Sequence, residues 1–566
     1  MQPLLSNNAS LNSYGSSGFS VVVRVRCSYQ PESTQDNGFM KALLLYPRFP
    51  QSFWSYDRVM ELAGLKAVIP PLGIITVAAL LPQDWEIRFY DRNVSLETEA
   101  DWEWCDLVIL SAMLVQKADF HALIQKAVQL GKKVAVGGPY PTSVPQDALD
   151  SGAHYLILDE GEMTVPPFLA AIAQGQTEGI FRSLEKPDVT LSPIPRFDLL
   201  QRDAYFMMAI QFSRGCPFSC EFCDIITLYG RKPRTKEPSQ TLAELQTLYD
   251  LGWRGSLFVV DDNFIGNQRN VKRFLRELIP WMKQRGYPFT FMTEASVNLA
   301  EDDELLQLMQ EAGFFAVFLG IETPDQDSLQ VTHKLQNTRH PLVEACHKIN
   351  EAGLLIYAGF ILGFDGERPG AGDRIQAFVE QTSIPQPMLG ILQALPNTAL
   401  WNRLQQEQRL VEGVGVTEVG DQNSLMNFVP TRPIAEIAKE YAEGFWTMYE
   451  PTSYLRRCFQ QCFKIGLAQG QKQIMQFPSG KGLRLVAQLI WHQGVKRPEI
   501  RAQFWHQLWT ILLRKPQVLN TYLGLCAAGE HFWEYRDLAR QRIAAQLGYD
   551  PLTNSAPSTT PTVVKA

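Results

Sequence analysis

Short apolar segments alternate with helical ones along most of this chain, and this alternation is the strongest constraint on its fold. Up to about residue 175 the predicted strands are 41–46, 86–90, 106–110, 133–136 and 155–158, and the predicted helices are 72–81, 117–130 and 163–174. Strands that alternate with helices form a parallel sheet with helices on its faces. We therefore expect a Rossmann-like, doubly wound α/β domain over residues 40–178, with ligands bound at the carboxyl ends of its strands.

The alternation resumes after a proline-containing linker over residues 179–204. Counting from a strand at 206–212, the chain continues as six β/α units, whose later strands are 255–260, 289–293, 316–320, 355–362 and one near 388–395. We expect a partial (β/α)₆ barrel over residues 205–424. The polar residues that follow its strands should then gather on one catalytic face.

Residues 425–548 carry a helical pattern, whereas the two ends of the chain are polar. The candidate helices are 434–448, 453–469, 482–494, 500–513 and 516–529, which predicts an all-helical domain. Its large aromatic residues and flanking cations suggest ordinary helix packing first. A lid for an apolar substrate or a membrane-surface face is the second interpretation. Residues 1–39 and 549–566 are predicted to be a disordered leader and tail, and Met40 is a candidate start of translation.

Three closely spaced cysteines, Cys216, Cys220 and Cys223, form a CxxxCxxC motif. Thiolates are the usual ligands of iron–sulfur clusters. Three of them hold three irons of a [4Fe–4S] cube and leave the fourth iron open to a small molecule. A structural zinc site normally needs a fourth protein ligand, and the nearest other cysteines, Cys105 and Cys346, are far away in the sequence. Zinc, or three merely structural thiols, are therefore the weaker interpretations.

Composition narrows the class of protein. The chain is 45% hydrophobic and 20% charged, as is typical of a soluble globular protein. Its net charge of −7 argues against nucleic acid as the main partner, and no apolar run is long enough for a transmembrane helix. The nine cysteines do not suggest a disulfide framework, and we expect a cytoplasmic protein.

The aromatic Phe222 directly before the last cysteine completes a CxxxCxΦC pattern. The stretch therefore resembles the radical S-adenosylmethionine (SAM) superfamily. The resemblance implies that the amino and carboxylate groups of SAM chelate the fourth iron. Reductive cleavage of SAM then gives methionine and a 5′-deoxyadenosyl radical. It also implies the partial barrel that the alternation predicts.

Further site residues are carried over by this resemblance. Asp261 or Asp262, at the end of the second barrel strand, is assigned to the SAM amino group, although the usual glycines are absent there. Glu322, after strand four, is assigned to the ribose. Helix capping or solvation is the alternative for these acidic residues. The adenine is assigned to three residues of strand five and the turn after it: Gly359, Ile361 and Gly363.

The first domain resembles the cobalamin-binding domain that precedes many radical SAM barrels. The resemblance rests on PPLG at 70–73, on VGGPYPT at 136–142 and on DEGE at 159–162. Gly137 and Gly138 lack side chains, so a bulky ligand can approach the backbone there, although glycine pairs are also common turn residues. The loop after the first strand has no DxHxxG histidine. Cobalt, if bound, would then have no protein imidazole below it.

The resemblance implies cobalamin-dependent methylation of an unactivated carbon. The alternatives are a radical SAM rearrangement or cyclisation and a non-enzymatic cobalamin or cluster sensor. A methylthiotransferase is disfavoured, because the first domain has only Cys105 where a second cysteine triad would be needed. The expected partners are a small-molecule or lipid substrate, since hopanoid C-methylases share this arrangement, and a reductase, ferredoxin or flavodoxin as electron donor.

Overall fold

The computed structural model describes residues 40–411, 423–467 and 481–556, which belong to one compact unit. The predicted leader lies outside the described residues, as does most of the predicted tail. Among the described residues, no helix is long and apolar enough to cross a membrane.

The first sheet has six parallel strands in the order β2-β1-β3-β4-β5-β6. Its strands are β1 (Lys41–Tyr46), β2 (Glu86–Asp91), β3 (Leu107–Ser111), β4 (Lys133–Gly137), β5 (Tyr155–Ile157) and β6 (Gly179–Phe181). The helices in this part of the chain are α1 (Asp57–Ala63), α2 (Leu72–Leu80), α3 (Glu99–Trp104), α4 (Lys117–Gln129), α5 (Pro139–Ser143), α6 (Pro145–Asp150) and α7 (Gly161–Ala173). The predicted doubly wound sheet is confirmed. Strand β6, however, lies inside the predicted linker.

Strand β1 shows why this sheet is covered on both faces. Leu44 packs into one hydrophobic core, while its neighbours Leu43 and Leu45 pack into a second core on the opposite face. Successive side chains of a strand point to opposite faces. A central strand with helices on both sides therefore needs the continuous apolar run found here.

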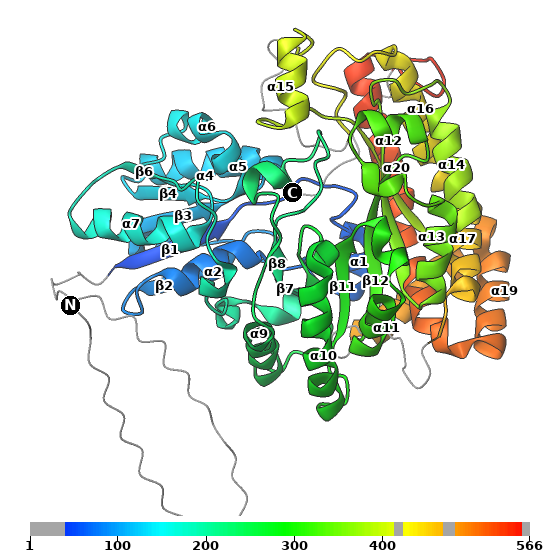
Figure 1. Ribbon diagram of the computed structural model, residues 1–566, viewed down its shortest axis with the longest axis horizontal. Helices are drawn as coiled ribbons and strands as arrows, with labels where there is room; N and C mark the ends of the chain where they lie inside the picture. Colours follow the sequence, from blue (N-terminus) through cyan, green and yellow to red (C-terminus); the bar gives the residue numbers. More distant parts are fainter. Residues whose placement is uncertain (1–39, 412–422, 468–480, 557–566) are drawn as a thin grey trace, which may run out of the picture. The chain divides into compact units, whose positions relative to one another are not determined.

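The second sheet also has six parallel strands, in the order β14-β13-β12-β11-β10-β7. They are β7 (Met207–Ile210), β10 (Ser256–Val259), β11 (Thr290–Ala295), β12 (Phe314–Glu322), β13 (Leu355–Leu362) and β14 (Gln386–Ile391). The helices between them are α9 (Pro238–Asp250), α10 (Gln268–Gln284), α11 (Asp303–Ala312), α12 (Gln326–Val331), α13 (Leu342–Glu351) and α14 (Ala371–Thr382). The sequential strand order confirms the predicted partial barrel (Figure 1).

A small antiparallel hairpin, which the sequence did not predict, interrupts this series after β7. Strand β8 (Ser213–Arg214) pairs with β9 (Arg234–Thr235), and the cysteine motif lies between them. The short helix α8 (Ile225–Leu228) follows Cys223, as expected for a loop that runs into a helix. The hairpin fixes both ends of the loop that carries the cysteines.

The C-terminal part is helical, as predicted, with α15 (Ala399–Gln406), α16 (Ile434–Met448), α17 (Pro451–Lys464), α18 (Lys481–Trp491), the π-helical turn η9 (His492–Lys496), α19 (Pro498–Arg514) and α20 (Leu519–Leu547). Helix α20 continues far beyond Gly529, where the sequence predicted its end. A Cβ at Gly529 would lie 2.9 Å from the Tyr454 ring. Glycine is therefore required at this position by close packing against Tyr454, and it does not end the helix. Arg540 holds Asp550 at 2.5 Å, so the predicted disordered tail begins with a fixed turn.

Candidate active site

The three motif cysteines lie in the loop between β8 and α8, near the carboxyl end of β7. Cys220 is buried, Cys216 and Cys223 are partly exposed, and none of them forms a disulfide. Burial raises the pKa of the Cys216 and Cys223 thiols. A buried thiolate is disfavoured here unless a positive charge lies next to it. Bound iron ions would supply that charge.

Polar groups from the barrel surround these sulfurs. Asn263 Nδ2 lies 3.8 Å from Cys216 Sγ, and Gln336 Nε2 lies 3.7 Å from Cys220 Sγ. Within the described ranges, no three His, Cys, Asp or Glu side chains converge as ligands of a single ion. A cuboidal cluster does not require such convergence, because each thiolate binds a different iron. Three unpaired thiols with amide donors beside them therefore fit a [4Fe–4S] cluster.

Asp261 and Asp262 anchor the start of the cysteine loop. Asp261 accepts hydrogen bonds from the backbone N–H groups of Phe212 (2.7 Å) and Ser213 (2.8 Å), and Asp262 accepts one from that of Gly215 (2.8 Å). Burial raises the pKa of Asp261 to about 7 and that of Asp262 to about 6. Both acids thus have a structural role that the sequence did not indicate, and their role toward the SAM amino group stays a prediction.

Glu322 ends β12 in a left-handed conformation, with φ of 65°. Its carboxylate accepts a 2.7 Å ion-paired hydrogen bond from Lys334 Nζ, and both side chains are mostly shielded from solvent. Burial alone would lower the pKa of Lys334, but Glu322 and then Cys220 raise it above its usual value. The ammonium also lies 5.9 Å from the ring centre of Phe222. Sequence reasoning missed Lys334, which lies twelve residues from its partner in the loop after α12.

Glu294 is a second residue that the sequence left without a role. It lies on β11 between the ends of β10 and β12, and no hydrogen bond to its side chain is found in the described part of the chain. Burial raises its pKa to about 8, helped by the charges of Asp262, Asp261 and Glu322. Its position at a strand end was the only signal that could have singled it out.

The strand-five residues lie in β13 and the turn after it. A Cβ at Gly359 would lie 3.0 Å from the Phe318 ring, and Ile361 is partly exposed. Gly363 has φ of 97°, and a Cβ there would lie 2.8 Å from Met426 Cε. Gly363 is therefore required by its own turn and packing. The assignment of the three residues to the adenine stays a prediction.

The glycine pair of the first sheet is also explained by packing. Gly138 has φ of 93°, and a Cβ there would lie 2.6 Å from Ser111 Oγ of the neighbouring strand. A Cβ at Gly137 would lie 2.7 Å from the Ile157 carbonyl oxygen. The two glycines allow β4 to approach β3 and β5 closely at the carboxyl edge of the sheet, where ligands of such sheets bind. Its role toward cobalamin stays a prediction.

The DEGE stretch joins the first sheet to the cysteine loop. Arg214 Nη1 donates to Glu160 (2.9 Å), and Arg214 Nη2 donates to Glu162 (2.8 Å). Arg234, opposite Arg214 in the hairpin, donates to Glu160 at 2.7 Å. The two glutamate side chains are buried, and the two arginine side chains are only 12% exposed. Glu160 and Glu162, which follow β5, thus hold the hairpin that carries the cysteines.

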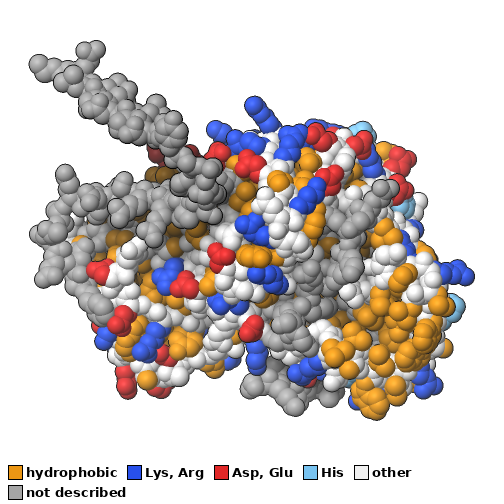
Figure 2. All heavy atoms as spheres, turned by 90° about the horizontal axis from the view of Figure 1, so that it is seen from below, with side chains coloured by type: hydrophobic (Ala, Val, Ile, Leu, Met, Phe, Trp, Pro, Cys, Tyr) orange, Lys and Arg blue, Asp and Glu red, His pale blue; other side chains and the backbone are white. Residues whose placement is uncertain are grey.

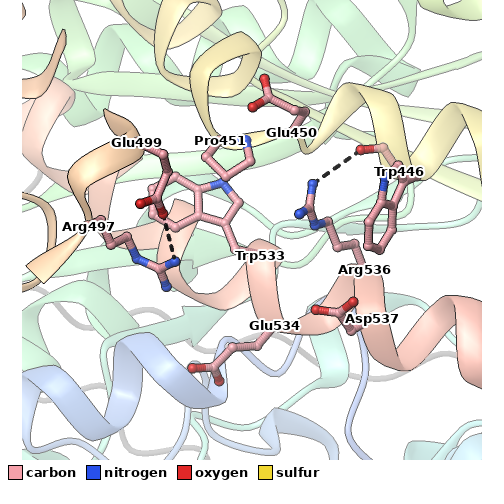
Figure 3. Close-up of a pocket in the computed structure, with 9 residues that line it drawn as sticks. All are labelled: Trp446, Glu450, Pro451, Arg497, Glu499, Trp533, Glu534, Arg536 and Asp537. Carbon is pink, nitrogen blue, oxygen red and sulfur yellow. Dashed lines mark hydrogen bonds and ion pairs between the residues drawn. The ribbon is translucent and has the colours of Figure 1, made fainter. Parts of the chain in front are cut away.

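A cavity of about 460 Å³ lies among the C-terminal helices (Figure 3). Arg497 and Glu499 form an ion pair on one side of it, and Arg536 donates to the carbonyl oxygen of Trp446 on the other. None of the predicted cofactor residues lines this cavity. Its charged lining does not suit an apolar substrate.

A doubly wound sheet followed by a partial parallel barrel with three unpaired loop cysteines defines an iron–sulfur enzyme of the α/β class. Three family models match the chain: the B12 binding domain at residues 62–169, the radical SAM superfamily at 210–373, and a domain of unknown function (DUF4070) at 398–545.

Relatives at the sequence level extend over nearly the whole chain. An uncharacterized methyltransferase of Synechocystis sp. is 56% identical over 90% of this chain and 94% of its own length. The hopanoid C-2 methylase of Rhodopseudomonas palustris is 33% identical over 82% of this chain and 88% of its own length. The chain therefore belongs to the radical SAM enzymes that carry a B12-binding domain, as its sequence predicted.

Solved structures share the fold at low sequence identity. The radical SAM methyltransferase TsrM of Kitasatospora setae, with cobalamin and a [4Fe–4S] cluster bound, has a TM-score of 0.58 at 14% identity and covers 89% of this chain and 100% of its own. The cobalamin-dependent radical SAM enzyme OxsB has a TM-score of 0.56 at 15% identity and covers 89% of this chain and 80% of its own. The predicted fold class is confirmed. The predicted cofactors, a [4Fe–4S] cluster, SAM and cobalamin, agree with the family.

Proposed function

We propose that this enzyme transfers a methyl group from SAM to an unactivated carbon of a polycyclic apolar lipid of the hopanoid class. Support for the substrate class comes from the 33% identity to a hopanoid C-2 methylase over 88% of that protein. Support for methyl transfer comes from the methyltransferases among the relatives. The cofactors supply the chemistry when bound: SAM cleaved at the cluster provides an organic radical, and cobalamin carries the methyl group.

The chain's own residues position these groups. Cys216, Cys220 and Cys223 would hold the cluster. Lys334 places a positive charge 5.9 Å from the ring centre of Phe222, next to the last motif cysteine, where the carboxylate of an amino acid would be attracted. Glu322, which holds Lys334 in place at 2.7 Å, keeps that charge fixed.

Acidic residues at the strand ends of the second sheet supply hydrogen-bonding groups to the candidate SAM site. Glu294, with a pKa of about 8, is mostly protonated at neutral pH and is able to donate a hydrogen bond. Asp262 accepts a hydrogen bond from the loop backbone, and its charge raises the pKa of Glu294. These groups suit the amino and hydroxyl groups of SAM.

The structural observation that best supports methyl transfer with two cofactors is the ion network between Glu160, Glu162, Arg214 and Arg234. Arg214 precedes Cys216 by two residues, and Glu160 lies at the carboxyl edge of the first sheet. A reaction that uses a radical and a methyl carrier on one substrate needs both cofactors at one site. The network ties the B12-type edge to the cysteine loop and so serves that need.

The proposal also places the enzyme in the cytoplasm and gives it an external one-electron donor, a ferredoxin or flavodoxin. A reducing compartment fits the eight described cysteines, all of which are unpaired. Reductive cleavage of SAM consumes an electron, so a donor of low potential is required.

The test is an anaerobic assay with reconstituted iron and sulfide, cobalamin, a strong reductant and SAM that carries a deuterated methyl group. A hopanoid hydrocarbon and, in parallel, a chlorophyllide would be offered as substrates. We expect 5′-deoxyadenosine, S-adenosylhomocysteine and a hopanoid that carries the labelled methyl group. The Cys216/Cys220/Cys223→Ala variant should give none of them, whereas Cys346→Ala, a buried cysteine outside the motif, should retain them.

Other outcomes would point elsewhere. Labelled chlorophyllide instead of hopanoid would refute the substrate class but keep methyl transfer. Deoxyadenosine with an unmethylated, altered product would favour a rearrangement or cyclisation. A reconstituted cluster without any SAM cleavage would favour a sensor.

A further inference from the structure

We propose that the face formed by α18, η9 and α19 is a docking surface for an anionic lipid membrane. Apolar residues recur at every fourth position along α18 into η9: Leu483, Ala487, Trp491 and Val495. Positions four apart lie on the same side of a helix. Leu483 is 80% exposed and Trp491 is 51% exposed, so this apolar row faces outward.

A second row continues the surface on α19. Its members, again at every fourth position, are Arg501, Trp505, Trp509 and Leu513. Trp509 is 57% exposed and Leu513 is 80% exposed. Trp505 ties α19 to η9, because its Nε1 donates to the carbonyl oxygen of the buried Gly494 at 2.9 Å. Figure 2 shows hydrophobic side chains gathered at the right of the face seen from below, the side on which Figure 1 places α19.

Such exposure calls for a binding partner. Single exposed apolar residues are normal on a monomer, but a contiguous apolar patch marks an interaction site. Here two tryptophans and two leucines are each more than half exposed on connected elements.

The charge of this region identifies the partner. Residues 481–515 contain seven Lys and Arg and one Glu, in a chain with a net charge of −7. Arg501 and Arg514 are exposed and form no ion pair with any described residue, and Lys496 Nζ lies 5.7 Å from the ring centre of Trp491. Cations beside exposed Trp and Leu are typical of helices that lie in the interface of an anionic membrane. Their long side chains reach the phosphates while their stems cover apolar surface.

A second copy of the chain is a poorer occupant. A two-fold contact would bring the same cationic face of both copies together, and like charges repel. A lipid surface supplies the opposite charge over the whole area of the patch. The inference does not depend on the proposed reaction, because it concerns a surface and not the site.

The test is flotation of the full-length protein with vesicles of phosphatidylcholine, with and without about one third phosphatidylglycerol, at low and high salt. We expect binding to the anionic vesicles, with a blue shift of tryptophan fluorescence. Weaker binding is expected to neutral vesicles and at high salt. Arg501→Gln/Arg514→Gln should bind about thirtyfold more weakly, since each cation near an anionic surface contributes about fivefold.

The apolar part is tested separately. Leu483→Ser/Leu513→Ser should weaken vesicle binding at least about tenfold. Ile180→Ser/Leu184→Ser is the matched control, because these residues are 56% and 87% exposed but lie at and after β6. For charge, the control is Arg269→Gln/Lys283→Gln on α10, where both side chains are exposed.

Three results would overturn the inference. The first is a wild-type protein that does not float with anionic vesicles at low salt. The second is an equal loss in patch and control variants, which would show a non-specific effect. The third is a dimer that the Leu483→Ser/Leu513→Ser variant dissociates, which would assign the surface to a second copy.

Discussion

The buried ion network between Arg214 and the DEGE stretch allows a quantitative prediction. Burial alone would raise the pKa of Glu162, but hydrogen bonds and charge from Arg214 lower it from 4.5 to about 2. This shift corresponds to about 3 kcal/mol in favour of the folded state. Because the folded-state pKa is lowered, the contribution is complete above about pH 4.5 and is lost as the pH falls through about 2. Glu162→Gln removes it at neutral pH without changing the size of the side chain.

Hydrogen exchange measured by mass spectrometry at neutral pH is the assay, because it reports local opening rather than unfolding of the whole chain. Peptides that cover residues 158–165 and 210–216 should exchange about a hundredfold faster in Glu162→Gln, as about 3 kcal/mol implies. Asp198→Asn is the control. Its partner Arg196 lies at 2.7 Å, but both side chains are substantially exposed. Such a surface pair contributes about 1 kcal/mol at most.

The reasoning is refuted if both peptides exchange in Glu162→Gln at the rate seen in Asp198→Asn. In that case the network would not hold the hairpin to the first sheet. A faster exchange confined to residues 158–165 would show that Glu162 stabilises only the start of α7.

Three further predictions concern the second sheet. Lys334→Gln should weaken SAM binding about tenfold or more and shift the reduction potential of the reconstituted cluster. Lys334→Arg, which keeps the charge, should largely preserve both properties. Unchanged binding and potential in Lys334→Gln would contradict the role of this charge. Gly363→Ala should lower the thermal midpoint of unfolding by several degrees more than Gly175→Ala. Both glycines have positive φ, but only Gly363 also lacks room for a Cβ. Equal losses in the two variants would show that packing against Gly363 is unimportant. Glu294 has a folded-state pKa raised to about 8, so its ionisation increasingly opposes folding between about pH 4.5 and 8. Glu294→Gln should therefore raise the midpoint relative to wild type at pH 8 but not at pH 4.5, and a gain equal at both values would contradict the assigned pKa.

Much of the fold was predictable because its strands and helices follow from the local spacing of apolar residues. The apolar runs of β1 and β13 begin and end in the structure at the predicted residues, 41–46 and 355–362. Strand β6 has only three residues, too few to show a period, so the sequence predicts a linker there. At Gly529 the sequence predicts a helix end, because glycine is a common C-terminal signal. Its packing against Tyr454 becomes visible only in three dimensions.

In the candidate site, only residues that are close in sequence gave a signal. The cysteine spacing identified the family, but Lys334 gave no signal of its own. It reaches the cysteine loop from more than a hundred residues away and is fixed there by a single ion pair with Glu322. Likewise, DEGE resembles a family motif, but its ion pairs to Arg214 and Arg234 depend on a hairpin that the sequence does not reveal.

The loop after β1 shows how one departure from the family pattern fits the rest of the molecule. Where a cobalt-ligating histidine would be expected, this loop carries Phe53, whose ring lies 4.6 Å from that of Phe532 on α20. The backbone oxygen of Phe53 also meets Nε2 of the buried His531 at 3.2 Å. At the start of the loop, the oxygen of Pro47 accepts a hydrogen bond from Gln116 at 2.5 Å. The loop is thus fixed by the first sheet at one end and by the C-terminal helices further on. A segment that supplies a metal ligand in related domains here joins the B12-type sheet to the helical domain, so the absence of the histidine is compatible with a well-ordered cofactor edge.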